Sequence, residues 1–181
     1  VVDPEAPVSS FHIDSASGRL TIAPNTPSII NGFDETAVEA ALRIKDSVGG
    51  AITVVSLGYN FLMDVMKKPL SMGVDNLVLL QDEAFENLDS FATAHVLSKA
   101  LAKIGEPDLI LCGRQASDWD NAQVPLGLAE LLDLPCLTIV KNIRVTRNKV
   151  EVERVLPNGY EVLQAKLPAL VTVSNELGEP R

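Results

Sequence analysis

The chain has 181 residues, 46% of them hydrophobic and 4% aromatic, which allows one domain with an aliphatic core of the kind found in layered α/β proteins. Its net charge of −9, without a cluster of Lys and Arg, argues against nucleic acid as a partner, because neutralising phosphates requires cations. No segment is apolar over the length of a bilayer and no signal peptide is visible, so membrane insertion is not expected. Cys112 and Cys136 lie in apolar surroundings, which predicts that they pack as small hydrophobes in a reducing compartment.

The first 30 residues are rich in Pro, Ser and Asp. Two short apolar segments, 11–13 and 19–22, flank the turn-forming sequence DSASG and predict a small hairpin. A loosely ordered N-terminal segment is an equally good interpretation. The chain starts at Val1 without an initiator Met, which suggests a fragment of a longer protein.

From residue 31 to residue 133, strand-like apolar segments alternate with segments of helical periodicity. The predicted helices cover residues 31–50, 60–72, 89–104 and 126–132, and the predicted buried strands cover residues 51–58, 75–82 and 109–111. Pro69 should bend or end the second helix, because proline lacks the amide hydrogen that a helix interior needs. This alternation predicts the α/β class with a doubly wound, mostly parallel sheet and right-handed crossovers.

Three of these helices have a clear apolar face at helical spacing. In the first, which Asp34 could cap, the residues expected on the buried side are Ala37, Val38, Ala41, Leu42 and Ile44. In the helix at 89–104 they are Phe91, Ala94, Leu97, Ala100 and Leu101. In the last helix they are Leu126, Leu128, Ala129, Leu131 and Leu132.

After Pro135 the sequence becomes rich in Val, Ile and Thr. Turn-forming sequences at 147–148 and 157–159 predict an antiparallel hairpin or meander formed by residues 144–155 and 159–166. The segment ALVTVSN then predicts a last buried strand. We therefore expect residues 1–181 to form a single domain that has an antiparallel hairpin in its C-terminal part.

The segment GRQASDWDNAQV, residues 113–124, is mostly polar or small and joins the strand at 109–111 to the next helix. Open α/β sheets bind ligands in such loops, at the carboxyl ends of their strands. Gly113 permits close approach of the backbone to a ligand, and the amides at the start of the following helix suit phosphate. An ordinary strand–helix connection without a ligand is an equally good interpretation.

The start of the helix after this loop can be placed in two ways. Asp120 with Gln123 resembles a capping box, whereas Pro125 is favoured at the first helical position. The loop acids Asp118 and Asp120 match no metal-binding spacing, so no metal site is predicted. Trp119 either covers a ligand or partner surface or is simply partly buried.

The sequence contains no pattern that predicts a catalytic group. His12 and His95 have no Cys, Glu or second His at ligand spacing, so both are expected to be surface or packed residues. The residues taken alone therefore indicate a binding domain for a phosphorylated ligand.

Four segments resemble, in order and spacing, the β-subunit family of electron transfer flavoprotein. They are PSIINGFDETAVEAALRIKD (27–46), MGVDNLVLL (72–80), DLILCGRQASDWDNAQV (108–124) and LPALVTVSNELGEPR (167–181). The resemblance extends from Ser28 to Arg181, and the Gly-Arg-Gln-Ala block at 113–116 is its most specific part. The Ala-Gln-Val sequence at 122–124 is similar to the nitrogen-fixation-linked, electron-bifurcating branch.

The resemblance implies a Rossmann-like nucleotide-binding fold akin to adenine-nucleotide α-hydrolase and universal stress domains. It implies a structural AMP, or a second FAD in that place in bifurcating relatives, and a heterodimer with an α-subunit that carries the redox FAD. Such a chain is an electron carrier subunit and not an enzyme, because the flavin supplies the redox chemistry. The implied electron partners are flavin dehydrogenases of the acyl-CoA type, in the cytoplasm of a bacterium or archaeon or in a mitochondrial matrix.

Carried over by position, the resemblance assigns the nucleotide site to the start of the first helix, the end of the second strand and the loop. These cofactor-binding residues are Asn31, Gly32, Phe33, Asp34, Leu57, Gly113, Arg114, Gln115, Ala116, Ser117, Asp118, Asn121, Ala122, Gln123 and Val124. Backbone amides and the side chains of Asn31, Gln115, Ser117, Asp118 and Gln123 are the expected polar contacts.

The chain departs from the family pattern at three places. The family's first strand should precede Val1, and its partner-docking loop and C-terminal arm should follow Arg181. Pro125 replaces a family glycine and removes an amide close to the expected phosphate. Two alternatives stay open: a free-standing adenine-nucleotide sensor of the universal stress type, and a nucleotide-hydrolysing enzyme, which needs a Ser-Gly-Gly turn after the first strand.

Overall fold

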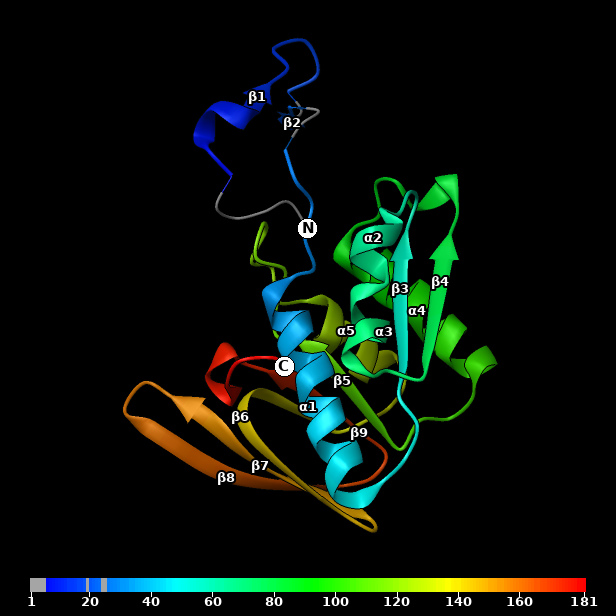
Figure 1. Cartoon of the computed structure of the whole chain (residues 1–181), viewed down its shortest axis with the longest axis vertical. Helices are drawn as coiled ribbons and strands as arrows, with labels where there is room; N and C mark the ends of the chain where they lie inside the picture. Colours follow the sequence, from blue (N-terminus) through cyan, green and yellow to red (C-terminus); the bar gives the residue numbers. More distant parts are fainter. Residues whose placement is uncertain (1–5, 19, 24–25) are drawn as a thin grey trace.

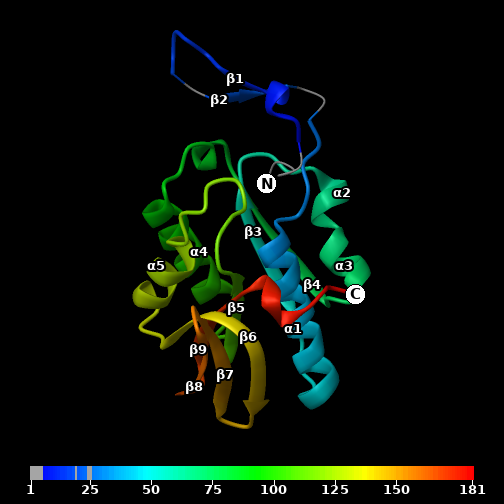
Figure 2. The same ribbon diagram turned by 90° about the vertical axis from the view of Figure 1, so that its left-hand side faces the viewer.

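The structure, a computed structural model, describes residues 6–18, 20–23 and 26–181 (Figures 1 and 2). The strands are β1 (Phe11–Ile13), β2 (Leu20–Ile22), β3 (Thr53–Gly58), β4 (Asn76–Gln81), β5 (Leu109–Gly113), β6 (Cys136–Thr146), β7 (Lys149–Leu156), β8 (Gly159–Lys166) and β9 (Ala169–Val173). The helices are α1 (Gly32–Val48), α2 (Met63–Met66), α3 (Lys68–Met72), α4 (Ser90–Ile104) and α5 (Val124–Leu131), with short 3-10 helices at Val8–Ser10, Glu83–Phe85 and Asn175–Leu177.

The predicted N-terminal hairpin is confirmed, although residue 19 of its second strand lies outside the described residues. The helical pattern at 60–72 is divided into α2 and α3 beside Pro69, as its missing amide predicts.

The described strands form three separate sheets. β1 and β2 pair antiparallel, β3 and β4 pair parallel, and the remaining strands form a mixed sheet in the order β5-β9-β6-β7-β8. The α/β class and the antiparallel C-terminal meander are confirmed. The prediction of one mostly parallel sheet differs from this pairing, because β5 pairs with β9 and not with β3.

The β5–β9–β6 part of the five-stranded sheet is covered on both of its faces, whereas one face of β8 is exposed. α1 packs on one face, where Ala37 and Ala40 meet Val140 and Val171, and α4 with α5 packs on the other (Figure 1). Leu109 and Leu111 of β5 contact the α1 side, whereas Ile110 and Cys112 contact the α4–α5 side. This two-sided burial explains why β5 is an apolar run without polar interruption.

The contact between α4 and α5 is built from small residues. A Cβ atom on Gly127 would lie 3.3 Å from the Cβ of Ala94, which is fully buried. The expected burial of Phe91, Leu126 and Leu131 is wrong, since they are 67%, 47% and 40% exposed. Close approach through Ala94 and Gly127 leaves these larger neighbours on the outer surface.

Both cysteines are free thiols that pack against the core on the α4–α5 side of the sheet. Burial raises the pKa of Cys112 to about 12, from an ordinary value of 9.0. We expect Cys112, tested in a Cys136→Ser variant, to react with a disulfide reagent roughly a thousand times more slowly than a free thiol, because only the thiolate attacks. A spectrophotometric thiol titration of the native and the unfolded chain checks this, and rapid native labelling would contradict it.

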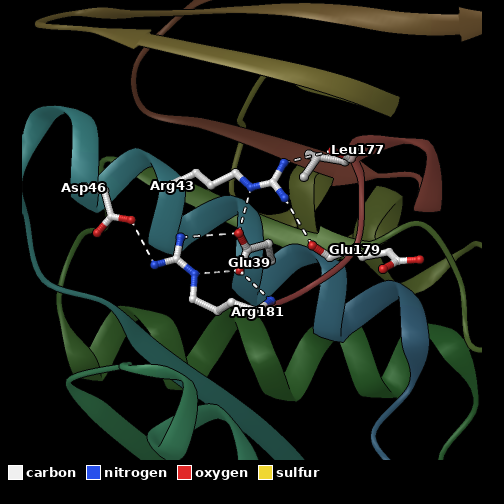
Figure 3. Close-up of polar contacts among 6 residues, drawn as sticks. All are labelled: Glu39, Arg43, Asp46, Leu177, Glu179 and Arg181. Atoms are coloured by element: carbon white, nitrogen blue, oxygen red, sulfur yellow. Dashed lines mark hydrogen bonds and ion pairs between the residues drawn. The ribbon is translucent and has the colours of Figure 1, made fainter.

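A cluster of ion pairs fastens the C-terminal segment to α1 (Figure 3). The carboxylate of Glu39, a residue only 3% exposed, accepts hydrogen bonds from Arg43 Nε at 2.7 Å and from Arg181 Nε at 2.9 Å. Arg181 also pairs with Asp46 at 2.9 Å, and Arg43 donates to two carbonyl oxygens within residues 177–179. Glu39 and Arg43 therefore hold residues 177–181, which follow β9, against the middle of α1.

Candidate functional site

The loop between β5 and α5 lies against the start of α1, and Asn31 makes the contact. Asn31 is only 6% exposed, and its Nδ2 donates to the carbonyl oxygen of Gln115 and to Asp34 Oδ2, both at 2.8 Å. Its Oδ1 accepts a hydrogen bond from the amide of Ser117 at 3.2 Å. One buried amide side chain thus joins the helix start to the loop that the sequence singled out.

The end of β5 touches the backbone of α1 at Gly113. The Gly113 amide donates to Asp34 Oδ1 at 2.9 Å. A Cβ atom at this position would lie 2.6 Å from Asp34 Oδ1 and 2.7 Å from the Asp34 amide nitrogen. Gly113 therefore allows the end of β5 to approach the start of α1 closely.

The predicted capping role of Asp34 is wrong. α1 begins at Gly32 with Asn31 before it, so Asp34 lies inside the first turn and bonds across to Gly113. Desolvation by the surrounding protein raises the pKa of the Asp34 carboxyl, against the hydrogen bonds from Asn31 and Gly113, which lower it. Asp34 is an exposed residue, so it is not part of the core.

The loop has its own internal bonds and an unusual backbone. Asp120 and Ala122 adopt left-handed conformations, with φ of 51° and 52°. The Asp120 carboxylate accepts a hydrogen bond from Gln115 Nε2. The backbone amide of Asp120 donates to the carbonyl oxygen of Ala116 at 2.9 Å. The expected capping box of Asp120 with Gln123 is therefore not formed.

α5 begins at Val124, so Pro125 occupies its second position and not its first. Neither α1 nor α5 has a side-chain cap, whereas Asp89 caps α4 by accepting from the Ala92 amide at 2.7 Å. The first-turn amides of α1 and α5 thus have no side-chain acceptor of the usual kind. Both helix starts border the loop.

Two polar atoms in the loop are buried without a partner among the described residues: Ser117 Oγ and Arg114 Nε. The Arg114 guanidinium lies 4.8 Å from the centre of the Phe33 ring, in a cation–π contact. Buried polar groups are normally hydrogen-bonded, so an unpaired hydroxyl in this loop is compatible with a further acceptor or donor there.

The structure distributes the remaining predicted site residues between the loop surface and a second sheet. Leu57 lies near the carboxyl end of β3, which does not pair with β5. Partly buried positions are Ala116, Ala122 and Val124, and exposed positions are Gly32, Asp118, Asn121 and Gln123. Trp119 is 72% exposed, so of its two interpretations simple partial burial is wrong, and a role in covering a ligand or partner surface stays a prediction. No group of three His, Cys, Asp or Glu side chains in the described part of the chain could hold a metal ion.

The carboxyl end of β9 borders the site and was not predicted to do so. The Arg114 amide donates to the carbonyl oxygen of Val173 at 3.1 Å, and the following Ser174 is fully buried. The sequence contains no local indication of this neighbour, because β5 and β9 pair across a long separation along the chain.

Comparison with known proteins identifies the family of the chain. The family model described as "Electron transfer flavoprotein domain" matches residues 19–181. The chain belongs to the electron transfer flavoprotein family. It is 44% identical over 173 residues to the electron transfer flavoprotein subunit beta of Thermoanaerobacterium thermosaccharolyticum, a match that covers 96% of this chain and 66% of the relative.

Other members of the electron transfer flavoprotein family are similar at nearly equal identity. The chain is 39% identical to the caffeyl-CoA reductase-Etf complex subunit CarD of Acetobacterium woodii and to Protein FixA of Azotobacter vinelandii, covering 93% of this chain and 64% of each relative. The chain thus spans about two thirds of the length of these relatives, and equal identities do not select a branch. Across the described residues, no helix has both the length and the apolar character needed to cross a bilayer.

Proposed function

We propose that this chain is the β-subunit-like component of an electron transfer flavoprotein. In this proposal it binds AMP, or the adenylate part of a second FAD, and carries electrons between flavin dehydrogenases and an acceptor only together with an FAD-bearing α-subunit. The observation that carries the proposal is the family match over residues 19–181, within which Asn31 joins the start of α1 to the loop after β5. The flavin would supply the electron chemistry, and the chain would supply binding and orientation.

The phosphate of the adenylate would bind where the two uncapped helix starts meet the loop. Exposed amides and the positive end of the helix dipole favour an anion at such a position. The residues available are the amides of Gly32 and Phe33, the amides of residues 122–124, and the Ser117 hydroxyl. Asp34 Oδ2 accepts a hydrogen bond from Asn31 Nδ2, and Asp34 Oδ1 accepts one from the Gly113 amide, so both of its carboxylate oxygens have partners within the protein.

The finer fold assignment belongs to the same proposal. A doubly wound, adenine-nucleotide α-hydrolase-like domain comprising residues 1–181 is supported by the two parallel pairs, β3–β4 and β5–β9. In Figures 1 and 2, the carboxyl ends of β3 and β4 point to the end of the molecule that carries the loop after β5. We further propose that the chain works in the cytoplasm with an α-subunit and a flavin dehydrogenase as its partners.

A Ser117→Ala variant tests the nucleotide site without weakening the fold. We expect it to unfold like the wild type, because Ser117 Oγ has no partner among the described residues, but to bind AMP about three- to tenfold more weakly in isothermal calorimetry. Ser47→Ala, on an exposed position at the far end of α1, is the matched control and should bind AMP like the wild type.

Mass spectrometry of the small molecule released on denaturation then separates AMP from FAD. Equal AMP affinity of Ser117→Ala and the wild type would contradict the assigned site. A chain that binds ATP as a monomer beside every α-subunit tested would instead support the free-standing sensor.

A further inference from the structure

The N-terminal hairpin, β1 with β2, has one apolar face. Its register pairs Phe11 with Ile22 and Ile13 with Leu20, and directly opposed residues share a face. We call these four side chains the hairpin face. The pair formed by residues 12 and 21 lies on the opposite side and is polar. Ile13, Leu20 and Ile22 are 74%, 53% and 40% exposed, so most of the hairpin face is in contact with solvent.

The shape of the hairpin is set by local contacts. The Asp14 carboxylate accepts a hydrogen bond from the Ala16 amide at 3.0 Å and another from the Ser17 hydroxyl, and the Ala23 amide donates to the carbonyl oxygen of Ser10 at 2.8 Å. Both views show the hairpin standing away from the body of the molecule (Figures 1 and 2). A two-stranded hairpin is only marginally stable in water, so an uncovered apolar face on such an element indicates a contact surface.

The same end of the molecule carries other exposed aromatic and aliphatic groups. Trp119, in the loop after β5, is 72% exposed, and Tyr59 and Leu62, which follow β3, are 50% and 57% exposed. Figures 1 and 2 both place this loop and the carboxyl end of β3 at the end from which the hairpin projects. Trp119 lies on a loop that is held by hydrogen bonds from the Ser117 amide to Asn31 and from Gln115 to Asp120. The exposed indole is therefore carried by an ordered part of the backbone.

We propose that the hairpin face and Trp119 form the docking surface for the second, different subunit of the complex. This inference rests on the proposed function and adds the location of the interface. A second copy of this chain is the less suitable occupant, because two chains of net charge −9 repel each other. A partner seated here would also lie over the loop of residues 114–123 and so shield the proposed nucleotide site from water.

The test compares two double variants of the whole chain. Ile13→Asp with Leu20→Asp changes the hairpin face, and His12→Asp with Thr21→Asp adds the same number of acids on the opposite face. The probe is the α-subunit that accompanies the 44% identical β-subunit of Thermoanaerobacterium thermosaccharolyticum. We expect the wild type to form a yellow complex, the hairpin-face variant to bind at least about tenfold more weakly, and the control to bind like the wild type.

Hydrogen exchange on the wild-type chain gives an independent readout that needs no folded variant. The amides of β1 and β2 should become protected when the α-subunit binds; unchanged exchange would overturn the assignment. If the wild type binds and the hairpin-face variant binds equally well, the docking surface is wrong but the proposed function stands. If the wild type does not bind the α-subunit, both are overturned. Sedimentation of a wild-type homodimer that Ile13→Asp with Leu20→Asp dissociates would assign the surface to a second copy instead.

Discussion

Gly113→Ala is expected to lower the free energy of unfolding by about 3 kcal/mol, because a methyl group has no space at the junction of β5 and α1. Its Cβ would lie 2.6 Å from Asp34 Oδ1 and 2.7 Å from the Phe33 carbonyl carbon. The second of these atoms is backbone and cannot move without shifting the start of α1. The shift would also weaken the hydrogen bond from the Gly113 amide to Asp34. Urea unfolding should show a lower midpoint with an unchanged slope.

Gly32→Ala is the matched control for this effect. It lies at the start of the same helix, and a Cβ atom there would meet no other heavy atom within 4 Å. Alanine also costs less conformational entropy in a helix than glycine, so this variant should equal the wild type or gain up to about 1 kcal/mol. Equal stability of Gly113→Ala and Gly32→Ala would show that the contact between β5 and α1 is looser than these distances indicate.

Glu39→Gln is expected to lower the free energy of unfolding at neutral pH by about 1–2 kcal/mol and to release the C-terminal segment. This decrease reflects the loss of charge-assisted hydrogen bonds. It does not include the larger cost of leaving a buried charge without a partner. The reason is that the side chains of Arg43 and Arg181 are 47% and 43% exposed and stay hydrated when their partner is neutralised. Faster hydrogen exchange at the Arg181 amide, which donates to Glu39 at 3.2 Å, would report the release.

Asp46→Asn separates burial from charge in this cluster. Asp46 pairs with the same arginine but its side chain is 61% exposed, so its loss should not measurably change stability. If Asp46→Asn were as destabilising as Glu39→Gln, the burial of Glu39 would have no special importance.

The effect of Glu39→Gln should also depend on pH. Burial disfavours the charge of Glu39, but hydrogen bonds from Arg181 and Arg43 outweigh it and hold the pKa of this carboxyl below its ordinary value of 4.5. A carboxyl with a lowered pKa in the folded state stabilises fully above its unfolded pKa, and this contribution is lost as pH falls through the folded pKa. The difference between wild type and Glu39→Gln should therefore be constant well above the ordinary pKa of 4.5 and should shrink as the pH falls through the lower folded-state pKa. A difference that grows in acid would contradict this account.

Most elements could be predicted from local pattern. α1, α4 and the strands β3 to β5 follow hydrophobic periodicity, and the positive φ of Gly49 ends α1 where the sequence indicated a stop. The turns after β6 and β7 also lie where turn-forming residues occur. These features depend on residues close together in the chain, so periodicity and turn chemistry suffice to find them.

The loop after β5 was found in the same way, but the residues that hold it were not. Asn31 reaches Gln115 across 84 positions of the chain, and Asp34 reaches Gly113 across 79. Asp34 and Asp120 were expected to cap helices, and each bonds to a partner outside its own helix start. A side chain that could cap its own helix can instead accept a hydrogen bond from a donor that the tertiary structure brings close.

The amino-acid pattern was sufficient to establish the α/β class, the strand–loop–helix unit around residues 109–131 and the C-terminal meander, because each depends on neighbouring residues. The assembled chain was needed to establish that β9 lies beside β5, that Phe91 and Leu126 face solvent, and that Glu39 is buried. Strand order and burial depend on partners distant in sequence. A glutamate on a helix is expected in solvent until Arg181, 142 positions away, is brought against it.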